Sequence, residues 1–386
     1  MHRNIKLLAA FNFFCDFRLY SAVLIIYFAR ITGSYALAMT LFSVTMISSS
    51  LFEIPTGIYS DLIGRKRTIM FGALASILAT VFYAIGQTYW ILFIGALFEG
   101  IARSWYSGNN DALLHDSLAE SNDQENYAHY LGKVSSMFQL ALAMAAVLGS
   151  ILAQWSFPLI MWLSVIPQVI CFGISLALIE PKSHTRESGN VFAHLTESFR
   201  LFIKHPTLRL VSLQSIIGFG IGESTFQFNS AFIATLWPIW AIGISKMLSF
   251  LGGMVSFWYS GALIKRFGSY QLLFFPSLYN RVVGFISVLF PSPLSPILIS
   301  SKSLSYGVGT IAENELLQKL FSDKQRATMG SFNSLFGSMF YGLYSIAIGR
   351  IADISSPARA LLFSEICLLS VIGITWYLWK KNRARI

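Results

Sequence analysis

The chain has 386 residues, of which 55% are hydrophobic and only 12% are charged, and its formal net charge is +10. A soluble domain carries about a quarter charged residues, so this composition excludes a water-soluble fold. The positive charge does not indicate a nucleic-acid-binding protein, because the basic residues fall in short clusters between apolar stretches, as they do in membrane proteins.

The first apolar stretch, residues 5–29, is predicted to cross the membrane. Basic residues precede it, as in a signal peptide, but the apolar core of a signal peptide has only about 7–15 residues. The stretch also contains Asp16 and Arg18, which do not suit a signal peptide.

Eleven further apolar stretches are each long enough to cross the hydrocarbon core, which takes about 20 residues of helix. The strands of a membrane barrel would alternate in polarity, and these stretches do not. We therefore predict an all-α integral membrane protein with twelve transmembrane helices. The predicted spans are 5–29, 36–59, 68–86, 90–112, 130–153, 155–179, 209–234, 238–262, 270–290, 294–316, 329–350 and 358–379.

The distribution of Lys and Arg predicts the orientation. One set of loops holds the basic triplet 65–67, Lys133 and the 180–208 stretch, whereas the opposite set holds only Arg30, Arg350 and Arg359. Basic loops stay on the cytoplasmic side, so both termini are expected in the cytoplasm of a bacterium, with the chain in the inner membrane.

A central polar segment, residues 181–208, separates two predicted six-helix bundles, 1–180 and 209–386. Val191, Leu195, Phe199 and Phe202 recur in it at helical spacing among polar residues. Two interpretations stay open, a flexible tether and an amphipathic helix on the inner membrane surface, and the second is favoured.

A weak internal repeat supports two related halves. A Gly-x-x-x-Asp-x-x-Gly pattern begins at Gly57, and it recurs at Gly261 with Lys265 in place of the aspartate. Residues 110–113 have a counterpart at 314–317 with the same offset of 204 residues. Such repeats are typical of secondary transporters, which bind substrate near the middle of the membrane between the repeats.

Residues 57–67, Gly-Ile-Tyr-Ser-Asp-Leu-Ile-Gly-Arg-Lys-Arg, join the second and third predicted spans. This stretch resembles the signature of the major facilitator superfamily, Gly-x-x-x-Asp-x-x-Gly-Arg-[Lys/Arg]-[Lys/Arg], and every defining position is filled. The resemblance implies a major facilitator fold, with twelve transmembrane helices in two pseudo-symmetric six-helix bundles.

The resemblance also implies a role for this motif as a conformational latch between the halves on the cytoplasmic side. Topology alone would explain the basic triplet but not the aspartate or the glycines. An aspartate at the membrane edge can accept charge-assisted hydrogen bonds, and a glycine allows close approach of a neighbouring helix. By match, the latch residues are Gly57, Asp61, Gly64, Arg65, Lys66 and Arg67.

Charged residues inside predicted spans are costly in a membrane and are therefore functional candidates. Several charged residues lie inside predicted spans without being among the leading candidates, namely Lys246, Lys302, Glu313 and Glu365. In the family that the motif resembles, spans one, four, seven and ten line the central cavity. The candidates for proton coupling or for the cavity are Asp16, Arg18, Glu99, Arg103, Glu223 and Arg281.

These charges have two interpretations. A desolvated carboxylate favours its neutral form and can carry a proton, which favours Asp16 or Glu223 as the proton carrier. Alternatively, the carboxylates form permanent structural ion pairs with Arg18, Arg103 or Arg281. Glu99 and Arg103 are one helical turn apart and could pair within their own helix.

The leading hypothesis is a proton-coupled secondary transporter that exports an amphipathic drug or metabolite by alternating access. Residues 141–150 lack the glycine–proline pattern of proton-driven exporters in the family, so uptake of a nutrient or siderophore is the alternative. A non-transporting membrane receptor is a remote third possibility.

An enzyme is not expected, because the six histidines fall in predicted loops or span ends without metal-ligand spacing, and no phosphate-binding loop is present. We therefore expect no cofactor or metal. The expected partners are a small-molecule substrate, protons and membrane lipid, with no nucleic acid, and the chain is expected to be a monomer.

Overall fold

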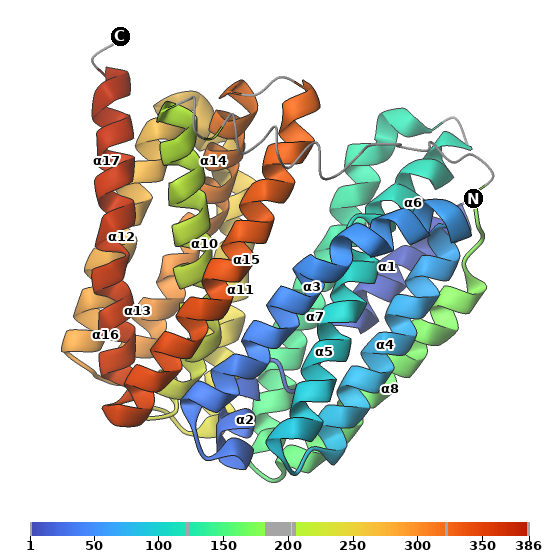
Figure 1. The fold of residues 1–386 in the computed structure, drawn as a ribbon, viewed down its shortest axis with the longest axis horizontal. Helices are drawn as coiled ribbons and strands as arrows, with labels where there is room; N and C mark the ends of the chain where they lie inside the picture. The colour runs from blue at the N-terminus through green and yellow to red at the C-terminus, as the bar shows by residue number, and fades with distance from the viewer. Residues whose placement is uncertain (1, 121–122, 182–201, 203–205, 321–322, 384–386) are drawn as a thin grey trace. The chain divides into compact units, whose positions relative to one another are not determined.

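The computed structural model describes residues 2–120, 123–181, 202, 206–320 and 323–383. In the first half the helices are α1 (His2–Asp16), α2 (Leu24–Thr32), α3 (Tyr35–Ile63), α4 (Arg65–Ile85), α5 (Tyr89–Tyr106), α6 (Asn109–Ala119), the short η1 (Gln124–Asn126), α7 (Tyr127–Ala153) and α8 (Phe157–Ala177). The second half contains α10 (Pro206–Ile233), α11 (Ile239–Phe267), α12 (Ser269–Leu289), α13 (Ser295–Ser301), η2 (Lys302–Ser305), α14 (Tyr306–Leu320), α15 (Asp323–Ile354), α16 (Pro357–Cys367) and α17 (Leu369–Arg383) (Figure 1). All regular structure in these residues is helical, which confirms the predicted all-α class.

Local signals in the sequence set several helix boundaries. Ser156 and Ser356 each precede a helix, and their hydroxyls accept hydrogen bonds from the backbone N–H groups of Leu159 and Arg359. A proline stands in the first turn of each helix, where its missing N–H costs nothing. Gly64 separates α3 from α4 with a φ of +96°, which a residue with a side chain rarely adopts.

Eight helices among the described residues are long and apolar enough to cross a membrane, and each coincides with a predicted span. They are Tyr35–Glu53, Arg65–Ile85, His129–Ala153, Phe157–Ala177, Ile239–Phe267, Ser269–Leu289, Phe332–Ile354 and Pro357–Asn382. The other four predicted spans, 5–29, 90–112, 209–234 and 294–316, each contain charged residues, and three of them break into separate helices. These four are spans one, four, seven and ten.

The continuity predicted for the first span was wrong. Its helix stops at Asp16 and resumes at Leu24, with residues 17–23 in turns. Helix breaks inside a membrane are tolerated where the freed backbone groups find protein partners. Span 294–316 likewise passes through η2 between α13 and α14.

The chain folds into two compact units. Unit 1 contains Met1–Gly33, Val44–Ser188 and Ile239–Ile244, and unit 2 contains Ser34–Ser43, Gly189–Pro238 and Ser245–Ile386. Helix α3 therefore begins in unit 2 and continues in unit 1, and α11 begins in unit 1 and continues in unit 2. The predicted amphipathic segment lies largely outside the described residues, so its helix stays a prediction.

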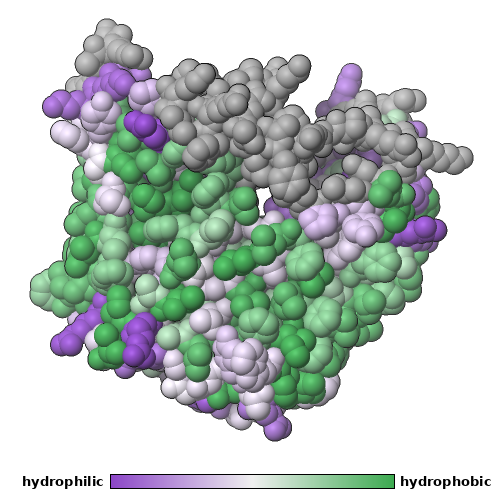
Figure 2. Space-filling model, in the orientation of Figure 1, coloured by the Kyte–Doolittle hydropathy of each residue, from purple (hydrophilic) through white to green (hydrophobic). Residues whose placement is uncertain are grey.

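Each unit has its own apolar core. In unit 1, Phe11 of α1, Ile69 of α4, Leu113 of α6 and Cys171 of α8 pack in one cluster. In unit 2, residues of α12 and α14 form another, which includes Leu272 and Val308. Figure 2 shows hydrophobic side chains over the middle of the helices and hydrophilic ones at their ends, as expected where lipid surrounds the helices.

Candidate transport site

Glu99 of α5 is the centre of a buried ion cluster in unit 1. Its Oε1 accepts hydrogen bonds from Arg18 Nη1 at 2.8 Å and from Arg103 Nη2 at 2.9 Å. Its Oε2 accepts one from the Tyr83 hydroxyl, also at 2.8 Å. The Glu99 side chain is only 6% exposed, so this carboxylate has exchanged water for three protein donors.

Arg18 connects this cluster to the break in the first span. Besides Glu99, it donates to the Ser76 hydroxyl at 3.3 Å and to the backbone oxygen of Cys15 at 3.0 Å. The Cys15 oxygen belongs to the last turn of α1, where carbonyl groups lose their helical partners. Arg18 therefore ties the end of α1 to α4 and α5.

Two polar side chains of α8 also form hydrogen bonds with the backbone at the break. Gln168 donates to the oxygens of Phe14 and Cys15 at 3.4 and 3.2 Å. Ser164 accepts a hydrogen bond from the Leu19 N–H at 3.0 Å. Gly149 of α7 packs so closely that a Cβ there would overlap the Leu19 oxygen. The break is therefore a specified feature of unit 1.

Asp16 lies beside this cluster without joining it. It is the last residue of α1 and is partly buried. Among the described residues, no basic nitrogen comes within 4 Å of its carboxylate, although Arg18 and Arg103 act on it at longer range. The electrostatic field at a helix C-terminus also disfavours a negative charge. Two predicted candidates thus differ in their ion pairs. The Glu99 carboxylate pairs with two arginines, whereas the Asp16 carboxylate has no basic nitrogen within 4 Å among the described residues.

A second ion cluster lies in unit 2. Glu365 of α16 forms ion pairs with Arg281 of α12 and with Lys302 of η2, the latter at 2.7 Å. The side chains of Arg281, Lys302 and Glu365 are 11%, 16% and 2% exposed. Gly284 leaves room for the carboxylate, because a Cβ at that position would overlap it. Arg281 was predicted as a candidate, and the structure adds the partners Lys302 and Glu365.

Glu223, the predicted candidate in span seven, lies in α10 of unit 2. Its Oε1 accepts a hydrogen bond from Gln227 Nε2 at 2.8 Å. Lys246 of α11 acts on it electrostatically from beyond ion-pair distance. The structure does not bring Glu223 to any of the other predicted site residues by a hydrogen bond or an ion pair within the described chain.

The latch motif lies at the junction of α3 and α4. Arg65 donates to Ser60 and Asn109 at 2.8 and 3.2 Å, and its Nε lies 3.9 Å from Asp116. The first N–H groups of α4, those of Arg65 and Lys66, donate to the Glu180 carboxylate at 2.7 and 2.8 Å.

The remaining positions of the motif differ in how closely they are packed. Arg67 is exposed, and no atom of the described residues lies within 4 Å of where a Cβ on Gly57 would stand. Gly64 faces the Glu180 carboxylate so closely that a Cβ there would lie 2.7 Å from Oε1. The side chain of Asp61 lies outside what the structure describes. The latch function of the motif stays a prediction.

A polar contact at the opposite end of α3 was not predicted from the sequence. The Asp353 carboxylate, in the last turn of α15, accepts hydrogen bonds from the Ser34 hydroxyl at 2.5 Å and from the N–H groups of Tyr35 and Ala36 at 2.6 and 3.0 Å. Gly349 allows the two helices to approach, because a Cβ there would lie 2.6 Å from the Tyr35 oxygen. Asp353 thus caps the start of α3 inside unit 2. The sequence shows Asp353 only as an acidic residue near a predicted loop, which does not indicate that it caps α3.

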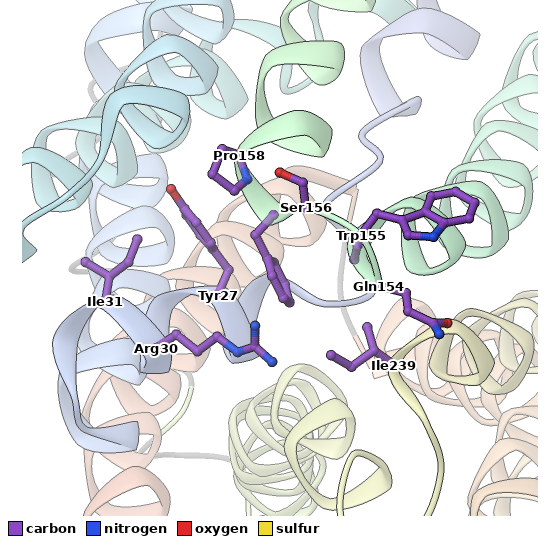
Figure 3. Close-up of a pocket in the computed structure, with 10 residues that line it drawn as sticks. Tyr27, Arg30, Ile31, Gln154, Trp155, Ser156, Pro158 and Ile239 are labelled. Carbon is purple, nitrogen blue, oxygen red and sulfur yellow. The ribbon is translucent and has the colours of Figure 1, made fainter.

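A pocket of about 400 Å³ lies within unit 1, at the turn between α7 and α8. Figure 3 shows that Tyr27, Arg30 and Ile31 of α2 and Ser156 and Pro158 at the start of α8 lie around this pocket. The Arg30 guanidinium stacks on the Phe157 ring at 4.6 Å. None of the predicted site residues line this pocket, so the ion clusters remain the better candidate site.

Comparison with known proteins places this architecture in a family. Residues 7–347 match the family model of the Major Facilitator Superfamily, and the chain belongs to this family of transporters. It is therefore a multi-pass membrane protein of a family that carries small-molecule substrates.

Individual relatives match over shorter stretches. The chain is 27% identical over 227 residues to the inner membrane transport protein YajR of Escherichia coli strain K12, which covers 55% of this chain and 46% of YajR. It is 23% identical over 128 residues to the tetracycline resistance protein, class E, of Escherichia coli, covering 33% of this chain and 30% of that protein. The matches thus span less than half of either relative.

The fold as a whole resembles that of solved transporters. A mutant of nucleoside transporter NupG superposes with a TM-score of 0.82, over 97% of this chain and 99% of that one. The two sequences are only 15% identical, so this likeness shows the shared fold and nothing about the substrate.

Proposed function

We propose that this protein is a proton-coupled transporter of the bacterial inner membrane that exports an amphipathic small molecule by alternating access, with Asp16 as the proton carrier. The observation that carries the proposal is the state of Asp16. It is a carboxylate at a helix break inside a predicted span, with no cation within 4 Å among the described residues. Broken helices of this kind form the substrate and ion sites of other secondary transporters.

Asp16 suits this role better than its neighbour. Glu99 is held by two guanidinium groups and a hydroxyl, so protonating it would strand two buried or half-buried cations. Asp16 has no such partner among the described residues. It can bind and release a proton without breaking the cluster, while the charges of Arg18 and Arg103 change their influence on it as the helices move.

The start of α3 supports alternating access. This helix begins in unit 2, where Asp353 caps it, and continues in unit 1. Three hydrogen bonds to one carboxylate can be made or lost together, so they form a two-state contact. The latch motif lies at the other end of the same helix, around Gly64 and Arg65. A helix that is held in unit 2 at one end and in unit 1 at the other suits a rocking mechanism, because it belongs to both of the parts that would move.

Two observations bear on direction. The similarity to a tetracycline resistance protein favours export, because a transporter gives resistance by lowering the amount of drug inside the cell. The missing glycine–proline pattern in residues 141–150 keeps proton-coupled uptake as the second candidate.

The test uses purified full-length protein in liposomes that contain a pH-sensitive dye, with tetracycline and uridine as the first external probes. Exchange of substrate for protons makes the interior more alkaline when substrate enters, whereas co-transport makes it more acidic, whichever way the protein is inserted. We expect alkalinisation with the wild-type protein and none with Asp16→Asn.

The matched control is Glu125→Gln, which removes an exposed carboxylate. It should behave as wild type. Substrate-driven pH change of normal size in Asp16→Asn would contradict the role of Asp16. Acidification in the wild-type protein would replace export with uptake.

A further inference from the structure

Lys246 is a buried cation of α11 in unit 2, and it is only 5% exposed. It lies seven residues after the first residue of α11, about two helical turns or roughly 10 Å along the helix axis. Among the described residues no carboxylate oxygen lies within 4 Å of its ammonium group. Two other basic residues deep inside predicted spans of this unit, Arg281 and Lys302, both pair with Glu365.

The ammonium group of Lys246 has only partial compensation. Its Nζ donates to the backbone oxygen of Phe226 at 2.6 Å, and it lies 3.6 Å from the centre of the Phe226 ring. A lysine ammonium carries three N–H donors, and for two of them the described residues provide no hydrogen-bond acceptor. A cation–π contact stabilises the charge, by about 2 kcal/mol or more when desolvated, but does not neutralise it.

Glu223 does not fill this gap. It acts on Lys246 electrostatically, but its Oε1 is engaged by Gln227 at 2.8 Å and it makes no ion pair with the lysine. The surroundings of Lys246 therefore combine a basic group that has no carboxylate within 4 Å among the described residues with aromatic surface. Phe250 packs edge-on against Phe226, with the ring centres 6.1 Å apart.

We propose that Lys246 binds the anionic group of the transported molecule, and that the substrate is an organic anion with an aromatic body. The anion supplies the charge and the acceptors that Lys246 lacks, and the Phe226 and Phe250 rings pack against the apolar part. This inference rests on the proposed transport function, since it names the substrate class of that activity.

The probe is a matched pair of the same shape, 2-naphthoate and 2-naphthamide, which differ in charge. Dissociation constants are measured by isothermal titration calorimetry on the detergent-solubilised full chain. We expect the wild-type protein to bind the acid about tenfold more tightly than the amide, which corresponds to about 1.4 kcal/mol. In Lys246→Gln the two constants should become equal, and Lys246→Arg should keep most of the preference.

The matched control is Lys380→Gln, which removes an exposed lysine that also lies over an aromatic ring, that of Trp376 at 5.1 Å. It should keep the wild-type preference. If Lys246→Gln is poorly folded, Lys246→Met takes its place, because it keeps an apolar side chain of similar length and removes the charge, and it should likewise bind the acid and the amide equally. Three results overturn the assignment: equal binding of acid and amide by the wild type, an unchanged preference in Lys246→Gln, or no binding of either probe.

Failure of this inference is distinguishable from failure of the transport proposal. Proton movement is read separately in liposomes. Selective binding of the acid without any substrate-driven pH change would keep the anion site and remove proton coupling. An Asp16-dependent pH change with equal binding of acid and amide would keep proton coupling and remove the anion site.

Discussion

The two ion clusters have the same stoichiometry, one carboxylate and two cations, but they differ in what surrounds them. In unit 2, Glu365, Arg281 and Lys302 are all nearly buried. In unit 1, Arg103 is 45% exposed, and a second carboxylate, Asp16, stands within electrostatic reach of Arg18. In unit 2, the two basic residues of the cluster have one carboxylate, Glu365, to pair with among the described residues. In unit 1, Arg18 could pair with Asp16 in place of Glu99. We therefore expect the ion pairs of the unit 1 cluster to change during transport and those of the unit 2 cluster to stay in place.

The largest effect is expected for Glu365→Gln. The substitution leaves two buried cations facing each other, with no second carboxylate acting on them among the described residues. Removing one partner of a buried pair costs about 3–5 kcal/mol. We expect the free energy of unfolding to fall by that amount, as measured by SDS titration of the detergent-solubilised protein. Near-wild-type stability would mean that the cluster is dispensable and would break the comparison.

Glu99→Gln should have a smaller effect on stability and a larger one on coupling. Arg18 loses its partner, but Asp16 can replace it, so we expect a loss of about 1–3 kcal/mol in the same titration. Asp16 would then be held in its charged form, and substrate-driven pH changes in liposomes should be abolished. If the proton signal persists while stability falls as far as in Glu365→Gln, Asp16 does not replace Glu99 as the partner of Arg18.

The smallest effect is expected for Arg103→Gln. Arg103 is nearly half exposed, and Glu99 keeps both Arg18 and Tyr83. Exposed ion pairs contribute about 0–1 kcal/mol, so stability should change by less than about 1 kcal/mol. Arg281→Gln is the matched variant in the buried cluster, and we expect it to cost more. Equal losses for the two arginines would show that exposure does not distinguish the clusters.

The sequence predicted the fold class well because hydropathy acts over whole spans. It also offered a pair between Glu99 and Arg103 as one of two interpretations, since residues four apart share a helix face, and the structure contains that pair. It could not predict that Arg18 would reach the same carboxylate, 81 residues away, because that contact depends on the break after Asp16. The break itself has no local signal such as proline or glycine in residues 17–23.

Partners supplied by distant helices were also beyond the sequence. Glu365 and Lys302 were visible as charges in apolar spans, but nothing in the chain order joins either of them to Arg281. Gln168 and Ser164 look like ordinary polar residues of an apolar span, and their function appears only once the broken backbone of the first span lies beside them. The contacts that specify this site are long-range, and periodicity describes only local ones.

The cap on α3 has a consequence for how the protein is made. Ser34 and Asp353 are 319 residues apart, so the start of this helix leaves the ribosome long before its partner. At about 5–20 residues per second, the delay is about 16–64 seconds. Unpaired N–H groups are costly in hydrocarbon, so during this delay we expect those of Tyr35 and Ala36 to donate hydrogen bonds to water at the membrane surface. The cap can therefore form only after α15 has been made, and a chain truncated before α15 would lack the carboxylate that accepts these N–H groups.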